Sequence, residues 1–283
     1  MTQLDVPTDN KGLGASRPGA RMLETKCAVV FGAGGSIGAA VAKEFAAEGA
    51  RVLLAGRTKA TLEALANQIT AAGGEVETTV VDVLNDANVN RYLDDVAKQA
   101  GQIDILIDLT GPRASEYGNG KVAVELPVDE FMVTLEKIVK SRFITSRAAA
   151  RHMVNQKSGV IIFVTGSPAR PHVPGATAIG AAFAALENLT MNLAFEVSPM
   201  GVRVVCLRTV ANIDIRTIQD TYGMKAERLK ITKEQAIGRV AHSTFLKVPA
   251  TVKDTANAAV LIAADRARMT RTVVNASAGA ALD

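Results

Sequence analysis

The chain has few of the residues that build stapled or metal-centred proteins. Its 283 residues include two Cys and three His, and no metal-ligand spacing connects them, so we expect no metal. Cys27 and Cys206 each lie inside an apolar run that predicts a strand. We therefore expect buried, unpaired thiols in a reducing compartment.

Long apolar runs are also missing. No run is long enough by inspection to span a membrane, and residues 1–23 contain no hydrophobic stretch typical of a secretory signal. We therefore expect a cytoplasmic protein with no membrane partner. The net charge of +4 is scattered without a Lys/Arg block, which argues against nucleic acid as a partner.

Trp is absent and aromatic residues make up only 4%, while apolar residues reach 48%. The apolar mass therefore comes mainly from Ala, Val, Ile and Leu, a composition typical of buried parallel strands flanked by Ala-rich helices. Such a core needs neither disulfides nor metals.

Short β-rich runs alternate with long helical stretches. We expect seven strands, at 27–31, 51–55, 76–81, 103–107, 160–164, 202–207 and 272–275, and helices ending near 47 and 73, starting near 86, and over 128–152, 176–197 and 252–264. Residues 211–250 are less periodic and predict an irregular helical excursion. This alternation predicts an α/β fold with a doubly wound parallel seven-stranded sheet and helices on both faces. We expect one domain, 24–283, after a flexible tail, 1–23.

A glycine-rich turn follows the first strand and opens a helix. It consists of Gly32, Ala33, Gly34, Gly35, Ser36, Ile37 and Gly38. Glycines allow a sharp turn close to a pyrophosphate, and the helix N-terminus offers free N–H groups and a positive dipole end. The turn predicts a Rossmann-type dinucleotide site, although a tight turn without a ligand remains the alternative.

The end of the second strand bears on which dinucleotide is bound. NAD-binding folds place a carboxylate there for the ribose 2′-hydroxyl, but this chain has Arg57. A guanidinium binds phosphate oxygens well, whereas a carboxylate would repel a 2′-phosphate. We therefore expect NADP(H) in preference to NAD(H), unless Arg57 simply points to solvent.

From about Glu24 onward the chain resembles the short-chain dehydrogenase/reductase family. The family's Gly-x-x-x-Gly-x-Gly turn maps onto Gly32, Ser36 and Gly38, and its adenine-contacting Asp-Val pair maps onto Asp82 and Val83. The resemblance implies cofactor contacts from the turn after the fourth strand, at Thr110 and Gly111. It also implies a small-molecule substrate and a homodimer or homotetramer.

The family's catalytic residues do not carry over. Its Tyr, Lys and Ser positions, aligned on Pro174-Gly175, fall on Ile179, Phe183 and Gly166, and its helix Asn falls on Ile138. Two turns differ as well: Asp108-Leu109-Thr110-Gly111 stands for Asn-Asn-Ala-Gly, and Thr209-Val210 stands for Pro-Gly. Because no Tyr lies between Tyr117 and Tyr222, no shift of the alignment restores the family's proton donor.

Other polar residues are expected to face the cleft at the carboxyl ends of the strands. The main catalytic candidates are Asp108, Thr165, Ser167 and His172. Each also has a structural alternative, because Asp108 can cap its own loop, Thr165 and Ser167 can bond nearby backbone, and a lone loop His is usually solvated. Further cleft candidates are Arg113, Tyr117, Arg208, Thr209, Asn212 and Tyr222.

These observations favour an NADP(H)-dependent oxidoreductase acting on a small, apolar carbonyl, alkene or alcohol. Its proton would come from water or from the substrate, since general acid catalysis typically contributes about 10²–10⁴-fold rather than the whole rate. A catalytically inactive dinucleotide sensor or assembly partner is the alternative. A third possibility, non-redox chemistry such as dehydration, has no specific support in the sequence.

Overall fold

The computed structural model describes residues 21–170, 173–210, 212–248, 250–264 and 266–280. Most of the predicted tail, residues 1–20, lies outside the described residues, as does His172. Leu23, which the sequence placed in the tail, is fully buried, and its N–H donates to the Glu48 carbonyl at 2.9 Å. The packed chain therefore begins before residue 24.

One parallel sheet forms the centre of the molecule, with strand order β3-β2-β1-β4-β5-β6-β7. Strands rich in Val, Ile and Leu are buried on both faces, as a parallel sheet requires. The strands are β1 (Cys27–Phe31), β2 (Arg51–Gly56), β3 (Val76–Val80), β4 (Ile105–Asp108), β5 (Gly159–Gly166), β6 (Val202–Thr209) and β7 (Thr272–Ala276). The predicted seven-stranded, doubly wound α/β fold is confirmed.

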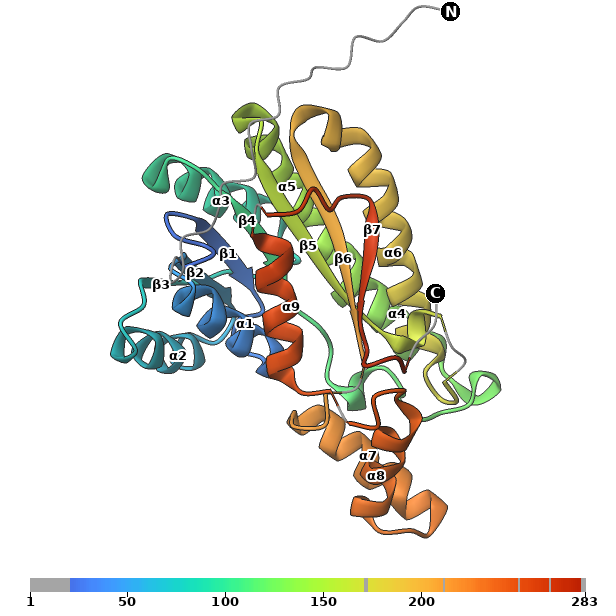
Figure 1. The fold of residues 1–283 in the computed structure, drawn as a ribbon. Coiled ribbons are helices and arrows are strands. Elements are labelled where there is room, and N and C mark those ends of the chain that lie inside the picture. The colour runs from blue at the N-terminus through green and yellow to red at the C-terminus, as the bar shows by residue number, and fades with distance from the viewer. Residues whose placement is uncertain (1–20, 171–172, 211, 249, 265, 281–283) are drawn as a thin grey trace, which may run out of the picture.

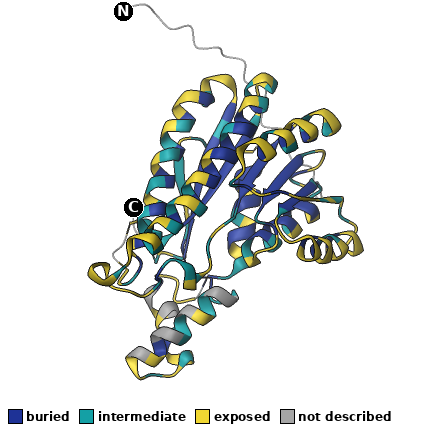
Figure 2. Cartoon of the chain, turned by 180° about the vertical axis from the view of Figure 1, so that it is seen from behind, coloured by how far each residue is buried: buried dark blue, intermediate teal, exposed yellow. Residues whose placement is uncertain are grey.

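Helices cover both faces of this sheet (Figure 1). One core cluster joins the sheet to α1 (Ser36–Ala47), α2 (Lys59–Ala71) and α9 (Val252–Ala263). The other joins it to α3 (Asp86–Ala100), α5 (Ser141–Gln156) and α6 (Thr177–Val197). Figure 2 shows buried strands between helices whose outer faces are exposed.

Two regions differ from the predicted elements. The expected helix 128–152 is divided into α4 (Val128–Thr134), a π-helical segment (Leu135–Lys140) and α5. Residues 211–250 are more regular than expected, because they contain α7 (Arg216–Leu229) and α8 (Lys233–Ser243). These two helices pack on each other and form a lobe beyond the carboxyl ends of the strands (Figure 1).

Helix α6 also modifies an expectation from the sequence. We expected no segment long enough to span a membrane, but Thr177–Met200 is long and apolar enough to do so by length and composition. In the fold, however, α6 packs on β5 and β6, and its Glu187 is buried. This packing is that of a helix in a layered α/β domain.

Candidate functional site

The turns after β1 and β4 meet at the point where the sheet changes its winding direction. Phe31 and Asp108 are paired in register, and the Leu109 N–H donates to the Phe31 carbonyl at 2.9 Å. Gly32 has φ +71°, and a Cβ there would lie 2.5 Å from the Thr110 backbone nitrogen. Only glycine allows the two turns to approach this closely. In doubly wound sheets, ligands bind in the crevice at this switch point.

The glycine turn presents its backbone to solvent. Gly34, Gly35 and Ser36 are exposed, and α1 begins at Ser36 with no side-chain cap and no acidic residue in its first turn. A Cβ on Gly38 would lie 2.4 Å from the Gly32 carbonyl oxygen, so glycine allows the helix to start directly on the turn. The helix N-terminus therefore keeps unbonded N–H groups and a positive dipole end in the crevice.

The ends of β2 and β3 continue this surface. Arg57 is exposed, and no ion pair holds its guanidinium within the described part of the chain. A Cβ on Gly34 would lie 3.1 Å from Thr61 Cγ2, so the start of α2 borders the glycine turn. Asp82 is exposed and accepts a hydrogen bond from the Leu84 N–H at 3.1 Å, whereas Val83 is buried.

Apolar side chains gather next to the crevice. Ile138 is buried with two residues of α6, and Ile179 and Phe183 pack against this cluster. A Cβ on Gly166 would lie 2.9 Å from Phe183 Cε2. The residues that the sequence alignment placed at the family's catalytic positions are therefore mutually packed, because the ring at 183 needs the space that Gly166 leaves.

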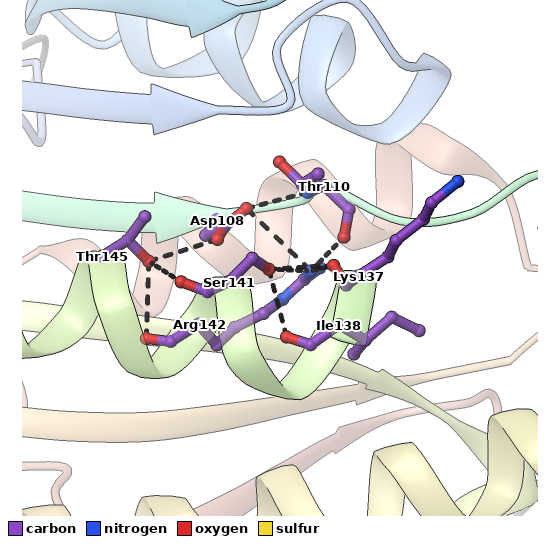
Figure 3. A network of polar contacts seen from close by, with 7 residues as sticks. All are labelled: Asp108, Thr110, Lys137, Ile138, Ser141, Arg142 and Thr145. Atoms are coloured by element: carbon purple, nitrogen blue, oxygen red, sulfur yellow. Dashed lines mark hydrogen bonds and ion pairs between the residues drawn. The ribbon is translucent and has the colours of Figure 1, made fainter. Parts of the chain in front are cut away.

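The sequence led us to expect that Asp108 faces the crevice, but its side chain lies inside the molecule. Its side chain is 1% exposed, and its carboxylate accepts hydrogen bonds from the Thr110 N–H at 2.9 Å and the Thr145 hydroxyl at 3.1 Å. Buried Arg142 lies beside it, with Nη1 4.0 Å from Asp108 Oδ1 (Figure 3). The same Nη1 donates to the Thr110 carbonyl oxygen.

Thr165 is also buried, beside a second charged group. Glu187 on α6 binds Arg208 through both carboxylate oxygens, at 2.7 and 2.9 Å. Arg170 donates from Nε to Glu187 at 3.0 Å, and the Thr165 hydroxyl lies 3.4 Å from the same carboxylate. The predicted cleft candidates Thr165 and Arg208 thus belong to an enclosed network.

The remaining polar candidates are divided between the surface and the interior. Ser167 is half-buried and begins a 3₁₀ turn, Ser167–Ala169, directly after Gly166. Thr209 and Asn212 are buried, and both bond the Thr255 hydroxyl, at 2.9 and 3.1 Å. Burial raises the pKa of both Tyr117 and Tyr222. Arg113 caps the 3₁₀ turn Ala114–Glu116.

Sequence reasoning missed three groups in this region. They are Arg142, Glu187, and the ion pair that Lys137 of the π-helical segment makes with Glu116. Lys137 holds the pKa of the Glu116 carboxyl below its ordinary value. A signal existed for Glu187, which interrupts the apolar run of α6, but none linked Arg142 to Asp108.

Both thiols are buried, as expected. Burial raises the pKa of Cys27 to about 11 and the pKa of Cys206 to about 12. Among the described residues, no three His, Cys, Asp or Glu side chains gather as a metal site.

Comparison with known proteins agrees with this architecture. A variant of actinorhodin polyketide ketoreductase with NADPH has a TM-score of 0.82 at 18% identity, over 90% of this chain and 97% of that one. NAD⁺-bound xylitol dehydrogenase also has a TM-score of 0.82, at 22% identity over 89% and 98% of the two chains. At such identities the likeness shows the fold alone.

The sequence comparisons reach further. Short chain aldehyde dehydrogenase 1 of Euphorbia lathyris is 30% identical over 254 residues, which cover 89% of this chain and 86% of that protein. Residues 26–212 match the family described as short chain dehydrogenase. The chain belongs to the short-chain dehydrogenase/reductase family.

Proposed function

We propose that this chain is an NADP(H)-dependent oxidoreductase acting on a small, apolar carbonyl, alkene or alcohol. The observation that carries the proposal is the exposed, uncapped glycine turn at the start of α1, with exposed Arg57 directly after the neighbouring strand β2. Family membership supports oxidoreductase chemistry, and the plant relative is named as an aldehyde dehydrogenase.

The residues present fit the dinucleotide. Gly32, Gly34, Gly35, Ser36, Ile37 and Gly38 would hold the pyrophosphate, because Gly34 to Ser36 are exposed there and side chains at 32 and 38 would clash. Arg57 would bind the 2′-phosphate, Asp82 and Val83 the adenine, and Thr110 and Gly111 the other half. Apart from Gly111 itself and its two chain neighbours, no described residue has an atom within 4 Å of a Cβ placed on Gly111, so this end of the turn is open. When bound, the nicotinamide supplies the hydride chemistry.

The chain's own contribution to the reaction would be position and exclusion of water. Ile179 and Phe183, which are partly buried and pack on buried Ile138, would form an apolar wall, which favours an apolar substrate. Of the three catalytic candidates that the structure describes, Ser167 is the one that is half-exposed beside Gly166, so it would orient the substrate. Asp108 and Thr165 are enclosed, and the proton would come from water or from the substrate.

A substrate panel tests this proposal. NADPH oxidation is measured with aldehydes, ketones and activated alkenes, and NADP⁺ reduction with alcohols. Arg57→Ala should raise the KM for NADPH about ten- to a hundredfold, the worth of a charge-assisted hydrogen bond of about 1.5–3 kcal/mol. Lys59→Ala is the control, because Lys59 is an exposed neighbour paired with Glu63. Equal behaviour of the two variants would contradict the role of Arg57.

The apolar cluster favours a second candidate, a dinucleotide-binding sensor or assembly partner without catalysis. Apolar side chains meet where the sequence alignment places the proton-transferring residues, so they cannot move a proton. Turnover of any panel substrate that is lost in Ser167→Ala, with NADPH binding retained, would exclude this candidate.

We also propose that the chain forms a homodimer or homotetramer. Phe143 on α5 and Phe195 on α6 are both exposed, on helices that cover the same face of the sheet. Sedimentation analysis of the wild type and of Phe195→Ser tests this assembly. A monomeric wild type would contradict it.

A further inference from the structure

We propose that the buried pair of Asp108 and Arg142 positions the turn at Thr110–Gly111 against the glycine turn, and so sets the affinity for the nicotinamide half of the dinucleotide. This inference rests on the proposed dinucleotide binding. It assigns Asp108 a positioning role, in place of the proton transfer that the sequence suggested.

The pair holds both backbone polar groups of one residue. Asp108 Oδ1 accepts from the Thr110 N–H at 2.9 Å, and Arg142 Nη1 donates to the Thr110 carbonyl oxygen (Figure 3). With its N–H and its carbonyl both fixed, Thr110 cannot rotate its peptide groups without breaking a charge-assisted hydrogen bond. Such bonds are roughly twice as strong as neutral ones.

The pair is itself anchored on α5 and the π-helical segment. The second carboxylate oxygen of Asp108 accepts from the Thr145 hydroxyl at 3.1 Å. Arg142 Nη1 lies 3.1 Å from the Ser141 hydroxyl oxygen and 3.4 Å from the Lys137 carbonyl oxygen. The turn is therefore tied to a helix on one face of the sheet and not only to its own strand.

Stability alone does not explain this arrangement. Arg142 is 4% exposed, burial lowers the pKa of its guanidinium, and its Nε has no hydrogen-bond partner in the described structure. Buried ion pairs contribute little net stability, and an unsatisfied buried donor is unfavourable. Because this arrangement is unfavourable for folding and holds one turn in place, we infer that the turn must keep its position for function.

The position of Thr110 matters because Thr110 lies directly against the glycine turn. The Thr110 nitrogen lies 2.5 Å from the place where a Cβ of Gly32 would be, so a shift of Thr110 presses on the pyrophosphate turn. In the strand order, β2 and β3 lie on the side of Arg57 and Asp82, and β4 lies on the opposite side of β1. The turn after β4 therefore borders the half of the dinucleotide that carries the nicotinamide.

Calorimetric titration with two ligands tests the inference. NADPH would span the whole crevice, whereas adenosine 2′,5′-bisphosphate would occupy only the adenine side. Arg142→Met should weaken NADPH binding by about tenfold or more, the equivalent of one charge-assisted hydrogen bond. Binding of the bisphosphate should stay within about twofold, that is within about 0.4 kcal/mol. Arg147→Met is the matched control, because Arg147 lies on the same helix and pairs with Asp86 at the surface.

A second variant covers the case in which Arg142→Met does not fold. Asp108→Asn keeps the size of the side chain and removes its charge, so it should show the same selective loss with a smaller magnitude. Equal loss of both ligands, or no loss of NADPH, would overturn the inference. If the wild type binds neither ligand, the dinucleotide proposal itself fails and this inference falls with it.

Discussion

The carboxyl edge of the sheet has two halves, one formed mainly by exposed backbone and the other by packed side chains. In the nucleotide half, made by the turns after β1, β2 and β3, the surface is exposed backbone from Gly34 to Ser36 with one exposed guanidinium, Arg57. In the reaction half, made by the turns after β4, β5 and β6 together with α6, packed and buried side chains predominate. There an apolar cluster lies beside two buried charged networks, around Asp108 and Glu187.

This difference would explain why the family is evident although the sequence predicts other residues at the family's catalytic positions. A site made from glycines and a helix terminus depends on backbone geometry, which the fold itself supplies. A site made from side chains changes its chemistry with each substitution, while the sheet beneath it stays the same. If this is correct, the reaction half should be sensitive to changes of side chains and the nucleotide half to changes of backbone geometry.

The largest effect is expected in the reaction half. Glu187→Gln removes the charge that Arg208 binds at 2.7 and 2.9 Å inside the protein. Breaking a buried pair costs about 3–5 kcal/mol, because the remaining buried charge loses its carboxylate. Denaturant unfolding measures the loss. Arg170→Ala, which removes the more exposed partner, should cost about 0–1 kcal/mol. Similar losses in both variants would contradict this account of the network.

The nucleotide half should be sensitive to a backbone change instead. Gly32→Ala imposes a side chain at φ +71°, with its Cβ 2.5 Å from the Thr110 backbone nitrogen. We expect the free energy of unfolding to fall by about 2–4 kcal/mol and dinucleotide binding to be lost. Gly101→Ala is the control, because Gly101 has φ +78° but a Cβ there would meet no described atom within 4 Å. It should cost about 1–2 kcal/mol from conformation alone. Equal effects would mean that the close approach to Thr110 is unimportant.

A double-mutant cycle tests the packing between Gly166 and Phe183. Gly166→Ser places atoms against the ring of Phe183, whose Cε2 is 2.9 Å from the position that a Cβ would take, and should cost about 1–3 kcal/mol. In a Phe183→Leu background the same change should cost less, with a coupling energy of about 1 kcal/mol. Additive effects would show that the two positions are independent.

The smallest effect concerns the two buried thiols, Cys27 at the start of β1 and Cys206 inside β6. Folding raises the pKa of Cys27 from 9.0 to about 11 and the pKa of Cys206 from 9.0 to about 12. A raised pKa contributes stability that is complete below pH 9 and is lost as pH rises toward the folded value. Cys27→Ala and Cys206→Ala should therefore flatten the decline of unfolding free energy above pH 9. An unchanged decline in both variants would contradict the raised pKa values.

The sequence predicted the sheet well because buried parallel strands form continuous apolar runs. It predicted the tight turn after β1 because only glycine fits at Gly32 and Gly38. It predicted helix boundaries less well, since the π-helical segment Leu135–Lys140 has no distinctive composition. Arg142 could not be linked to Asp108 from sequence, because the two meet only through the packing of α5 on β4. Glu187 had a visible signal, a charge within an apolar helix, but the sequence did not show that its partner is Arg208 of β6.

The most direct test of the central claim, a working dinucleotide site beside an altered reaction half, is parallel calorimetric titration of the wild type with NADPH, NADP⁺, NADH and NAD⁺. The account predicts saturable binding at one site per chain, with the phosphorylated pair at least about tenfold tighter, since Arg57 adds about 1.5–3 kcal/mol. Binding of none of the four would contradict the account, because the glycine turn would then hold no ligand.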